Sequence, residues 1–246
     1  MTAITSAHNP KLKDVRRLAR KRDRERGGRF VAEGEDLVGA AELAGWPAVE
    51  GYRVAGSDLG GKGFTDVERD ALAAVSTLGS GTRVIGVYEQ RWGEPCGPVC
   101  VYLHGVGDPG NVGTVLRGAL AFGASCVVLG PGCADPYSPK AVRASMGTIF
   151  AVGLARAGDV KELPGERVAL VAGAGEPLSA LSVKLAGSAA VTLLVGSERE
   201  GLPDEVVKAC EHVAHIPIAV ESLNAAMAAT VALYETTRGS TRVRAS

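Results

Sequence analysis

Apolar strand-like runs alternate with amphipathic helical patterns beyond about residue 95. The strand-like runs are CVYLHGV, SCVVLG, RVALVAG, VTLLVG and HVAHIPI, and the helical patterns include NVGTVLRGALAFGA, PKAVRASMGTIF and LPDEVVKAC, with a last helix from about Ser222. Near-continuous apolar strands combined with such helices are typical of a mostly parallel sheet that is covered on both faces. We therefore expect an α/β domain whose ligands bind at the carboxyl ends of its strands.

A smaller α/β unit is predicted ahead of this domain. A helical pattern runs from Pro10 to about Ala44, interrupted at GGRF, and the strand-like runs EGYRVA and TRVIGVYE follow it. The segment EQRWGEPCGPV, residues 89–99, combines proline, glycine and polar residues as linkers do. We place the domain boundary in this segment, which gives an N-terminal domain over 1–95 and a C-terminal domain over 96–246.

The charge of the whole chain is balanced, but its distribution is not. The formal net charge is zero, whereas residues 11–29 hold ten Lys or Arg against three Asp or Glu. Such a basic segment can follow the phosphates of a nucleic acid with little sequence preference. The alternative is an ordinary solvated helix whose acidic residues partly balance the basic ones. The segment is the one electrostatic feature that points to a nucleic-acid partner.

Cysteine usage and hydropathy bear on the compartment. Five cysteines form an odd set without a CxxC pair, which argues against a disulfide framework and against a zinc knuckle. Cys210, His212 and His215 have the pattern CxHxxH, but strand alternation sends neighbours to opposite faces and no fourth ligand is evident. The N-terminus MTAITSAHNPKLK lacks an apolar signal core, and no run of about 18 apolar residues occurs. We expect a cytoplasmic protein with reduced thiols, no metal and no membrane span.

Three polar, glycine-containing turns end strand-like runs in the second half: GDPGNVGTVLR, GSEREGLP and VESLN. Because each follows an apolar strand, all three can meet at one edge of one sheet, where glycine lets backbone groups approach a ligand closely. Neither GxGxxG nor the P-loop pattern is present, so a dinucleotide or P-loop phosphate site is poorly supported. Taken singly, each turn also has an ordinary structural interpretation, with Asn111 and Ser222 as helix caps and Arg117 and Glu198 as solvated residues.

In their order and spacing, four segments closely resemble the signature segments of the SpoU (TrmH-type) RNA 2′-O-methyltransferases of the SPOUT superfamily. They are DPGNVGTVLRGALAFGA, DPYSPKAVRASMGTIF, LLVGSEREGLP and IPIAVESLNAAMAATVALYE, and they span roughly residues 99–236. FVAEGEDLVGAAEL resembles the N-terminal substrate-binding region of the same family. Several ordered motifs together are far more specific than any one of them.

The resemblance implies a fold that the alternation of strands and helices alone does not predict. Members of this family carry a deep trefoil knot in the parallel-sheet domain, one of the rare exceptions to the rule that chains do not thread loops. A small α/β, ribosomal-protein-like RNA-binding domain precedes it. The knot holds S-adenosylmethionine, and by position Gly196, Ile216 and Leu223 would line the adenosine pocket. The family also implies a homodimer whose active site lies near the subunit interface, with a contribution from the last helix.

The same match implies a reaction centre of five polar residues, namely Asn111, Arg117, Glu198, Ser222 and Asn224. The reaction is an in-line transfer of a methyl group from a sulfonium to a ribose hydroxyl, which requires an oriented substrate and removal of the hydroxyl proton. A guanidinium is a poor base unless its environment perturbs it, as an adjacent RNA phosphate would. We therefore expect Arg117 to orient a phosphate and to stabilise negative charge that develops on the oxygen.

The predicted function is methylation of a ribose 2′-hydroxyl in RNA, with rRNA as the first substrate and tRNA as the second. A non-catalytic RNA-binding factor on the same scaffold is the alternative from another class, and the intact polar set argues against it.

Three further observations leave their alternatives open. The third motif, IPIAVESLN, is about two residues shorter than is usual in the family, which leaves the contacts of residues 219–221 in doubt. Lys140, Arg143 and Ser145 either lie along a helix edge near RNA or belong to a salt-bridged surface helix. Trp46 and Trp92 are interpreted as packing residues, because no other aromatic residues surround them in the sequence.

Overall fold

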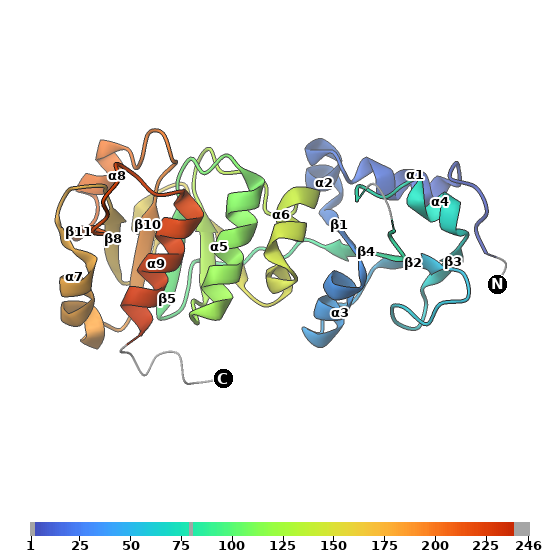
Figure 1. Ribbon diagram of the computed structural model, residues 1–246, viewed down its shortest axis with the longest axis horizontal. Coiled ribbons are helices and arrows are strands. Elements are labelled where there is room, and N and C mark those ends of the chain that lie inside the picture. The colour runs from blue at the N-terminus through green and yellow to red at the C-terminus, as the bar shows by residue number, and fades with distance from the viewer. Residues whose placement is uncertain (1–2, 79–80, 239–246) are drawn as a thin grey trace. The chain divides into compact units, whose positions relative to one another are not determined.

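The chain forms two compact units in the computed structural model, which describes residues 3–78 and 81–238 (Figure 1). The first unit comprises Met1–Arg91 and Asp135–Ala151, and the second comprises Trp92–Ala134 and Val152–Ser246. The chain therefore leaves the first unit in the predicted linker, returns to it for seventeen residues, and leaves it again.

The predicted domain ranges, 1–95 and 96–246, include residues 1–2, 79–80 and 239–246, which lie outside the described residues. That these ranges are separate functional domains stays a prediction.

A mixed four-stranded sheet forms the centre of the first unit, in the order β1-β4-β2-β3. The central strand β4 pairs antiparallel with β1 and β2, whereas β2 pairs parallel with β3. The strands are β1 (Arg29–Glu33), β2 (Glu50–Val54), β3 (Thr65–Val67) and β4 (Val84–Glu89). The helices are α1 (Pro10–Arg17), α2 (Lys21–Gly27), α3 (Glu35–Leu43), α4 (Arg69–Ala73) and α6 (Pro139–Ser145), with the 3₁₀ turn η1 (Thr148–Phe150). The predicted small α/β unit is confirmed.

The helical pattern predicted from Pro10 to Ala44 is wrong in its middle, where the structure has strand β1. Asn9 caps α1, since its side chain accepts a hydrogen bond from the backbone N–H of Lys11, and Gly28, at a φ of 61°, ends α2. Strand β1, which follows Gly28, pairs with β4, and its central apolar residues are buried. The strand depends on a partner more than fifty residues downstream, so a local pattern does not reveal it.

The two faces of this sheet carry separate cores. On one face, side chains of α1 and α4 pack against the strands; this core includes Leu12, Val15, Leu72, Val31, Tyr52 and Ile85. On the other face, Phe150 of η1 contacts the rings of Phe30, Trp46 and Tyr88, with ring centroids 5.8, 5.3 and 5.0 Å apart. Segment Asp135–Ala151 thus completes this second core, and Trp46 is a packing residue, as predicted.

One basic residue of segment 11–29 is buried instead of facing solvent. The Arg24 side chain is 3% exposed, and its Nη2 and Nε donate to the carboxylate of Asp135 at 2.7 and 2.9 Å. Its Nη1 donates to the backbone oxygens of Leu18 and Ala19, both at 2.8 Å. Arg24 therefore ties the turn between α1 and α2 to the returning segment, and its charge does not contribute to a surface for phosphates.

The second unit is built on a seven-stranded sheet whose pairings are all parallel, in the order β7-β6-β5-β10-β8-β11-β9. Its strands are β5 (Val99–Leu103), β6 (Cys126–Leu129), β7 (Gly153–Arg156), β8 (Glu166–Leu170), β9 (Glu176–Pro177), β10 (Val191–Val195) and β11 (His212–His215). Every residue of the adjacent central strands β5 and β10 is buried. The predicted parallel α/β domain is confirmed.

Helices cover both faces of this sheet. They are α5 (Pro109–Ala121), α7 (Leu178–Lys184), α8 (Asp204–Lys208) and α9 (Ala225–Thr237), with the 3₁₀ turns η2 (Val160–Glu162) and η3 (Leu185–Gly187). α9 packs against α5, α7 and β10, while Val206 of α8 and Val160 of η2 belong to the core of the opposite face. α5 and α9 approach closely at Gly118, where a Cβ atom would lie 3.0 Å from Oγ1 of Thr230. The helix predicted over PKAVRASMGTIF forms only as α6 and belongs to the first unit.

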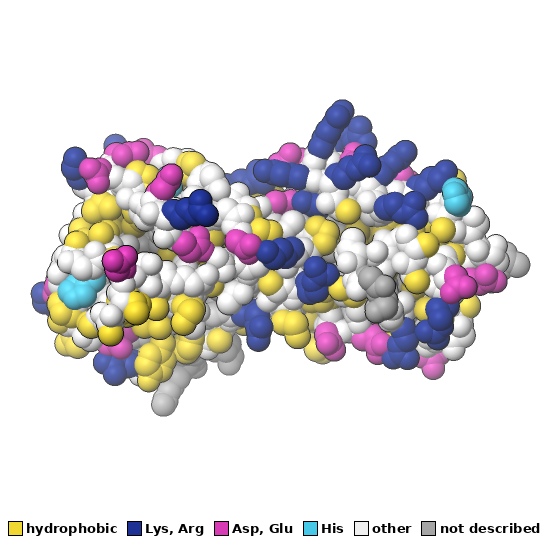
Figure 2. All heavy atoms as spheres, turned by 45° about the horizontal axis from the view of Figure 1, so that its top comes forward, with side chains coloured by type: hydrophobic (Ala, Val, Ile, Leu, Met, Phe, Trp, Pro, Cys, Tyr) yellow, Lys and Arg dark blue, Asp and Glu magenta, His cyan; other side chains and the backbone are white. Residues whose placement is uncertain are grey.

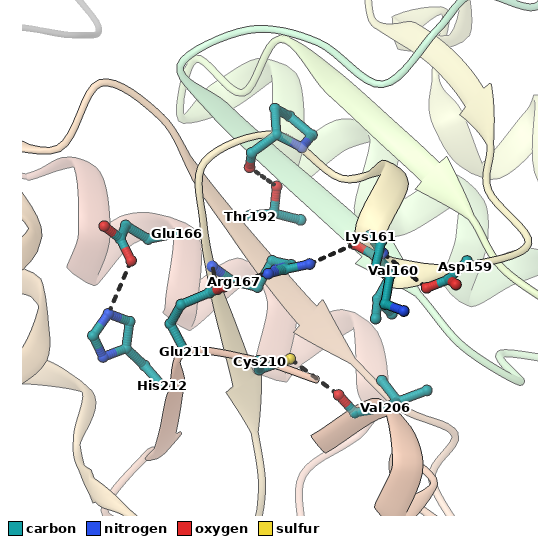
Figure 3. Close-up of polar contacts among 11 residues, drawn as sticks. Asp159, Val160, Lys161, Glu166, Arg167, Thr192, Val206, Cys210, Glu211 and His212 are labelled. Carbon is teal, nitrogen blue, oxygen red and sulfur yellow. Dashed lines mark hydrogen bonds and ion pairs between the residues drawn. The ribbon is translucent and has the colours of Figure 1, made fainter. Parts of the chain in front are cut away.

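Polar side chains join β8 to β11 at the amino-terminal edge of this sheet (Figure 3). Arg167 donates from Nη2 to Oε1 of Glu211 and from Nε to Oε2 at 3.0 Å, and its backbone N–H also donates to Oε2 at 2.9 Å. Its Nη1 reaches the backbone oxygen of Val160 at 3.4 Å. Beside this pair, Nε2 of His212 lies 3.3 Å from Oε2 of Glu166. The hydrogen bonds from Arg167 lower the pKa of Glu211 to about 2, from an ordinary value of 4.5.

Glu211→Gln is expected to make the stability of the protein less dependent on pH. A carboxylate whose pKa is lowered by folding contributes stability that is fully present above about pH 4.5 and is lost as the pH falls towards 2. The Glu211 side chain is 38% exposed, so we expect a contribution of no more than about 1 kcal/mol. The difference in thermal midpoint between the wild type and Glu211→Gln should be constant from pH 7 to 5 and shrink below that. A difference that stays constant down to acid pH would contradict this assignment.

Candidate functional site

A cavity of about 340 Å³ opens in the second unit at the carboxyl ends of β8, β10 and β11. Three loops and the start of α9 line it. Its lining residues are Leu170, Val171 and Ala172 at the end of β8, Val195 to Leu202 at the end of β10, Ile216, Ile218, Ser222 and Leu223 after β11, and Ala225 and Ala228 of α9. The position at the carboxyl ends of parallel strands is the one expected for a ligand site in such a sheet.

Two of the three predicted turns line this cavity directly, those after β10 and β11. The three residues expected to hold the cofactor, Gly196, Ile216 and Leu223, are all in its wall, together with Glu198 and Ser222. The loop after β8 was not predicted as part of the site. Its sequence, LVAGAG, carries the same signal as the others, an apolar strand that ends in a glycine-containing turn, and this signal would have identified it.

The turn after β5 joins the site through hydrogen bonds. Nδ2 of Asn111 donates to Oε1 of Glu198, and Nδ2 of Asn224 donates to Oδ1 of Asn111 at 3.1 Å. Glu198 and Asn224 lie 87 and 113 residues after Asn111 in the sequence. The three side chains, one from each turn, thus form a continuous polar chain. Each amide uses one donor in this chain, which fixes which end of the Asn111 side chain faces Glu198.

Helix caps hold two members of this polar chain in place. The Asp108 carboxylate caps α5 and accepts from the backbone N–H groups of Gly110 and Asn111 at 2.6 and 3.1 Å. Oδ1 of Asn224 caps α9 by accepting from the backbone N–H groups of Ala226 and Met227. The structural interpretation of Asn111 and Ser222 as caps is therefore wrong, and the predicted helix start at Ser222 moves to Ala225. Asn224 both begins the helix and presents its amide to the site.

Arg117 is the one predicted site residue that the structure does not bring to the cavity. It lies exposed on α5, six residues after Asn111, and this separation turns the side chain about 120° around the helix axis. It is not among the residues that line the cavity, and within 3–78 and 81–238 it forms no hydrogen bond or ion pair. In the isolated chain its guanidinium thus points to solvent.

The loop after β10 is a tight turn around Gly196. The backbone N–H of Gly201 donates to the oxygen of Ser197 at 3.0 Å, and Oγ of Ser197 accepts from the N–H of Glu200 at 3.2 Å. A Cβ atom at residue 196 would collide with the carbonyl of Gly201. Glycine is therefore needed at 196 for close packing of the backbone, and this packing places Glu198 at the tip of the turn.

Gly196→Ala is expected to weaken binding at this cavity at least about tenfold, because the turn must open to accept the methyl group. Gly187→Ala is the matched control, since a Cβ atom at residue 187 meets nothing within 4 Å. Calorimetric titration of S-adenosylmethionine into both variants measures the effect. Equal affinities of the two variants would show that the turn does not shape the site.

The shortened part of the third motif lies away from the cavity. Ala219, Val220 and Glu221 are exposed and do not line it, while Ile218 and Ser222 on either side do. That this loop is shorter than is usual in the family stays a prediction.

Residues 3–78 and 81–238 form neither a cluster of metal ligands nor a membrane-spanning helix. No group of three or more His, Cys, Asp or Glu residues there is arranged to hold a metal ion. Cys210 donates from Sγ to the oxygen of Val206 at 3.2 Å, and His212 contacts Glu166, so these two side chains have separate partners. No helix in the same ranges is long and apolar enough to cross a membrane.

Comparison with known proteins gives two matches to family profiles. Residues 98–234 match the SpoU rRNA Methylase family, and residues 9–86 match the MRM3-like substrate binding domain. Among characterised relatives, the 23S rRNA (guanosine(2553)-2′-O)-methyltransferase RlmP of Bacillus subtilis is 31% identical over 247 residues, which cover 95% of this chain and 98% of that protein.

Two solved structures are similar over almost the whole chain. The AdoMet-bound rRNA methyltransferase from Sinorhizobium meliloti has a TM-score of 0.85 and 33% identity, with 96% of this chain and 97% of that chain covered. The SpoU methyltransferase AviRb from Streptomyces viridochromogenes, in complex with AdoMet, has a TM-score of 0.82 and 25% identity, with 94% and 98% covered.

Proposed function

Because this chain belongs to the SpoU rRNA methylase family, we propose that it transfers a methyl group from S-adenosylmethionine to a ribose 2′-hydroxyl of rRNA. The observation that carries the proposal is the polar chain of Asn111, Glu198 and Asn224 beside the cavity at the carboxyl edge of the sheet. This arrangement puts hydrogen-bonding groups next to a pocket of the size of small-ligand sites, which are about 300–1,000 Å³.

The residues around the cavity suit S-adenosylmethionine. Leu170, Ile216 and Leu223 give an apolar wall for the adenine, and the bare backbone at Gly196 lets amide and carbonyl groups reach the ligand. The Glu198 carboxylate in the wall suits the positive charge of a sulfonium. When bound, the cofactor supplies an electrophilic methyl group. We assign Gly196, Ile216 and Leu223 to the adenosine.

The chain's own polar groups orient the acceptor ribose. We assign this role to Asn111, Ser222 and Asn224, whose amide and hydroxyl groups can hold the ribose hydroxyl in line with the transferred methyl. Glu198 fixes the orientation of the Asn111 amide through their hydrogen bond. Arg117 orients an RNA phosphate and stabilises negative charge that develops on the attacking oxygen.

We also propose a homodimer, and this assembly explains the position of Arg117. An apolar stripe of α9 faces solvent at Met227, Val231 and Tyr234, which are 57%, 39% and 51% exposed, and Leu120 of α5 adds to it. Hydrophobic side chains gather near the end of the described chain in Figure 2. Leu120 lies one turn after Arg117, so a second copy docked on the stripe would meet Arg117 at the interface. Arg117 then serves a site that is shared between subunits.

Val231→Asp is expected to convert the dimer to a monomer, because it places a charge in the centre of the apolar stripe. Leu43→Asp is the control, since Leu43 is 93% exposed on α3 of the first unit. Sedimentation equilibrium measures the molecular mass of both variants. A wild type that is monomeric at all concentrations would overturn the dimer.

The first unit supplies RNA binding in this proposal. Figure 2 shows Lys and Arg side chains gathered over α1 and α2, and eight basic side chains of these helices and the turn between them are exposed. These are Lys11, Lys13, Arg16, Arg17, Arg20, Lys21, Arg22 and Arg26. The match of residues 9–86 to a substrate-binding domain supports the same role. In α6, Ser145 is fully buried, so of the α6 residues predicted to lie near RNA only Lys140 and Arg143 remain candidates.

Two finer features of the family are proposed with this function. The loops after β10 and β11 would form the deep trefoil knot, which is supported by their convergence on one cavity and by the placement of β10 between β5 and β8. A cytoplasmic location is proposed because the substrate is rRNA and the five cysteines are free.

Incubation of unmodified rRNA and tRNA with labelled cofactor tests the reaction, followed by alkaline hydrolysis. A methylated 2′-oxygen prevents cleavage of the adjacent phosphodiester, so we expect the label in alkali-resistant dinucleotides from rRNA. Label in mononucleotides would mean base methylation, and label only in tRNA would move the substrate to the second candidate. A folded protein that binds no S-adenosylmethionine in calorimetry would favour the non-catalytic RNA-binding factor.

A further inference from the structure

The first unit contains a second cavity, of about 460 Å³, between the sheet and the loop that precedes β3. Aromatic side chains make up much of its wall. Its lining residues are Val38, Glu42, Gly45, Trp46, Pro47, Ala48, Gly61, Lys62, Phe64 and Tyr88. All of them except Tyr88 lie within residues 9–86, the part that matches a substrate-binding domain.

Two glycines in the middle of the sheet make room for two of the side chains that line this cavity. Gly51 of β2 and Gly86 of β4 are directly paired across the strands. A Cβ atom at Gly51 would collide with the Phe64 ring, and one at Gly86 would collide with the Tyr88 side chain. Neither glycine has a positive φ, so the backbone conformation does not require them. Glycine weakens a strand interior, and it is typical of sites where another group must lie close to the backbone.

The Tyr88 hydroxyl at this cavity has no hydrogen-bond partner among residues 3–78 and 81–238. Tyr88 is 1% exposed, and burial raises its pKa to about 12. The other three fully buried tyrosines all have partners, since Tyr52 bonds Glu50, Tyr102 bonds His104 and Tyr137 bonds the oxygen of Arg91. Within residues 3–78 and 81–238, the fully enclosed side-chain N and O atoms that lack a partner are Nδ1 of His215 and Oγ1 of Thr236, so the Tyr88 hydroxyl opens into the cavity. A hydroxyl in that position can donate to and accept from a group that comes from outside the chain.

The surrounding groups indicate what this partner is. Phe64 in the wall offers an aromatic ring against which a planar base can stack, while Trp46, whose ring lies under the Arg91 guanidinium at 4.1 Å, adds apolar surface beside it. The exposed Lys62 ammonium suits a phosphate, and the Glu42 carboxylate and the Tyr88 hydroxyl suit polar groups at the edge of a ring. We propose that this cavity binds one unstacked nucleobase of the RNA substrate, with Phe64 against the ring, Trp46 beside it and Tyr88 bonded to its edge. This inference rests on the proposed RNA substrate.

The two tryptophans allow a direct test by NMR on the full-length protein. Nε1 of Trp46 donates to the oxygen of Glu89 at 3.2 Å beside the cavity, whereas Trp92 lies in the second unit under the guanidinium of Arg156. We would titrate AMP, GMP, CMP and UMP at millimolar concentration and follow the two indole N–H signals. At least one nucleotide is expected to move the Trp46 signal and to leave the Trp92 signal in place. Ribose 5-phosphate, which lacks the base, is expected to move neither.

Tyr88→Phe removes only the unpartnered hydroxyl and is expected to weaken nucleotide binding about fivefold, without lowering the thermal midpoint. Tyr52→Phe is the matched control: it removes a partnered hydroxyl from the other core of the same unit, so it should lower the midpoint and leave binding unchanged. No response to any of the four nucleotides, an equal response to ribose 5-phosphate, or wild-type affinity in Tyr88→Phe would each overturn the inference.

Titration of S-adenosylmethionine into the same samples separates the two proposals. If the protein binds the cofactor but its Trp46 signal does not respond to any nucleotide, the nucleobase proposal is wrong and the methyltransferase proposal stands. A protein that fails to bind the cofactor would remove the proposed function itself.

Discussion

Asp135→Ala is expected to destabilise the first unit by about 3–5 kcal/mol, because it leaves the Arg24 guanidinium buried without its carboxylate. Arg24 and Asp135 are 3% and 10% exposed, so water does not replace the lost partner. The carboxylate also accepts from the backbone N–H of Tyr137 at 2.9 Å, which adds to the loss. Urea unfolding followed by Trp46 fluorescence measures the change, in a Trp92→Phe background that leaves Trp46 as the single tryptophan.

Asp14→Ala is the control for this prediction. Asp14 pairs with Arg17 at the surface, where both side chains are more than 60% exposed, and such a pair contributes about 1 kcal/mol or less. The double variant Arg24→Met/Asp135→Ala should regain part of the lost stability, since an apolar side chain needs no partner. If Asp135→Ala lowers the free energy of unfolding by no more than Asp14→Ala does, the buried pair does not hold the returning segment in place.

Asn111→Asp is expected to reduce methyl transfer about 10²–10³-fold, while cofactor affinity changes little. An aspartate there cannot donate to Glu198, and it places a second carboxylate within hydrogen-bond reach of the first. Two such carboxylates repel each other, and this raises the pKa of one of them and disturbs the acceptor position. Asn111 does not line the cavity, so the cofactor site should persist. Turnover at saturating S-adenosylmethionine and calorimetric affinity measure the two effects separately.

Thr114→Ala is the matched control, one turn further along the same helix. Thr114 is exposed, and its hydroxyl donates only to the oxygen of Gly110 among the described contacts. Its removal should leave turnover within about twofold of wild type. Similar turnover in Asn111→Asp and the wild type would mean that the polar chain holds the loops together and takes no part in positioning the ribose.

The parallel sheet could be predicted from the sequence because its strands are apolar at every position. β5 and β10 are buried throughout, so their composition alone identifies them. Strand β1 was missed, since RFVAE is short and stands between two helical patterns, and only pairing with β4 makes it a strand. Local periodicity reports which face of a segment is buried, and it does not report a partner that lies far along the chain.

The same distinction holds at the candidate site. Family resemblance placed Asn111, Glu198 and Asn224 in one centre, and the structure links these three side chains by hydrogen bonds. Asn224 rather than Ser222 caps α9, which a cap preference alone does not decide because serine and asparagine are equally good caps. Arg24 was counted with the surface charges, since nothing in the basic run identifies the one residue whose carboxylate lies 111 residues away.

The return of Asp135–Ala151 to the first unit also governs how the parts of such a protein can be exchanged. A chimera cut once in the linker would combine the sheet of one parent with the Phe150, Tyr137 and Asp135 of the other. Those residues contact Phe30, Trp46 and Arg24, so two sets of core side chains would have to match by chance. Grafting a new RNA specificity onto this catalytic unit therefore requires two transplanted segments, and natural recombination at the linker alone should rarely yield a folded protein.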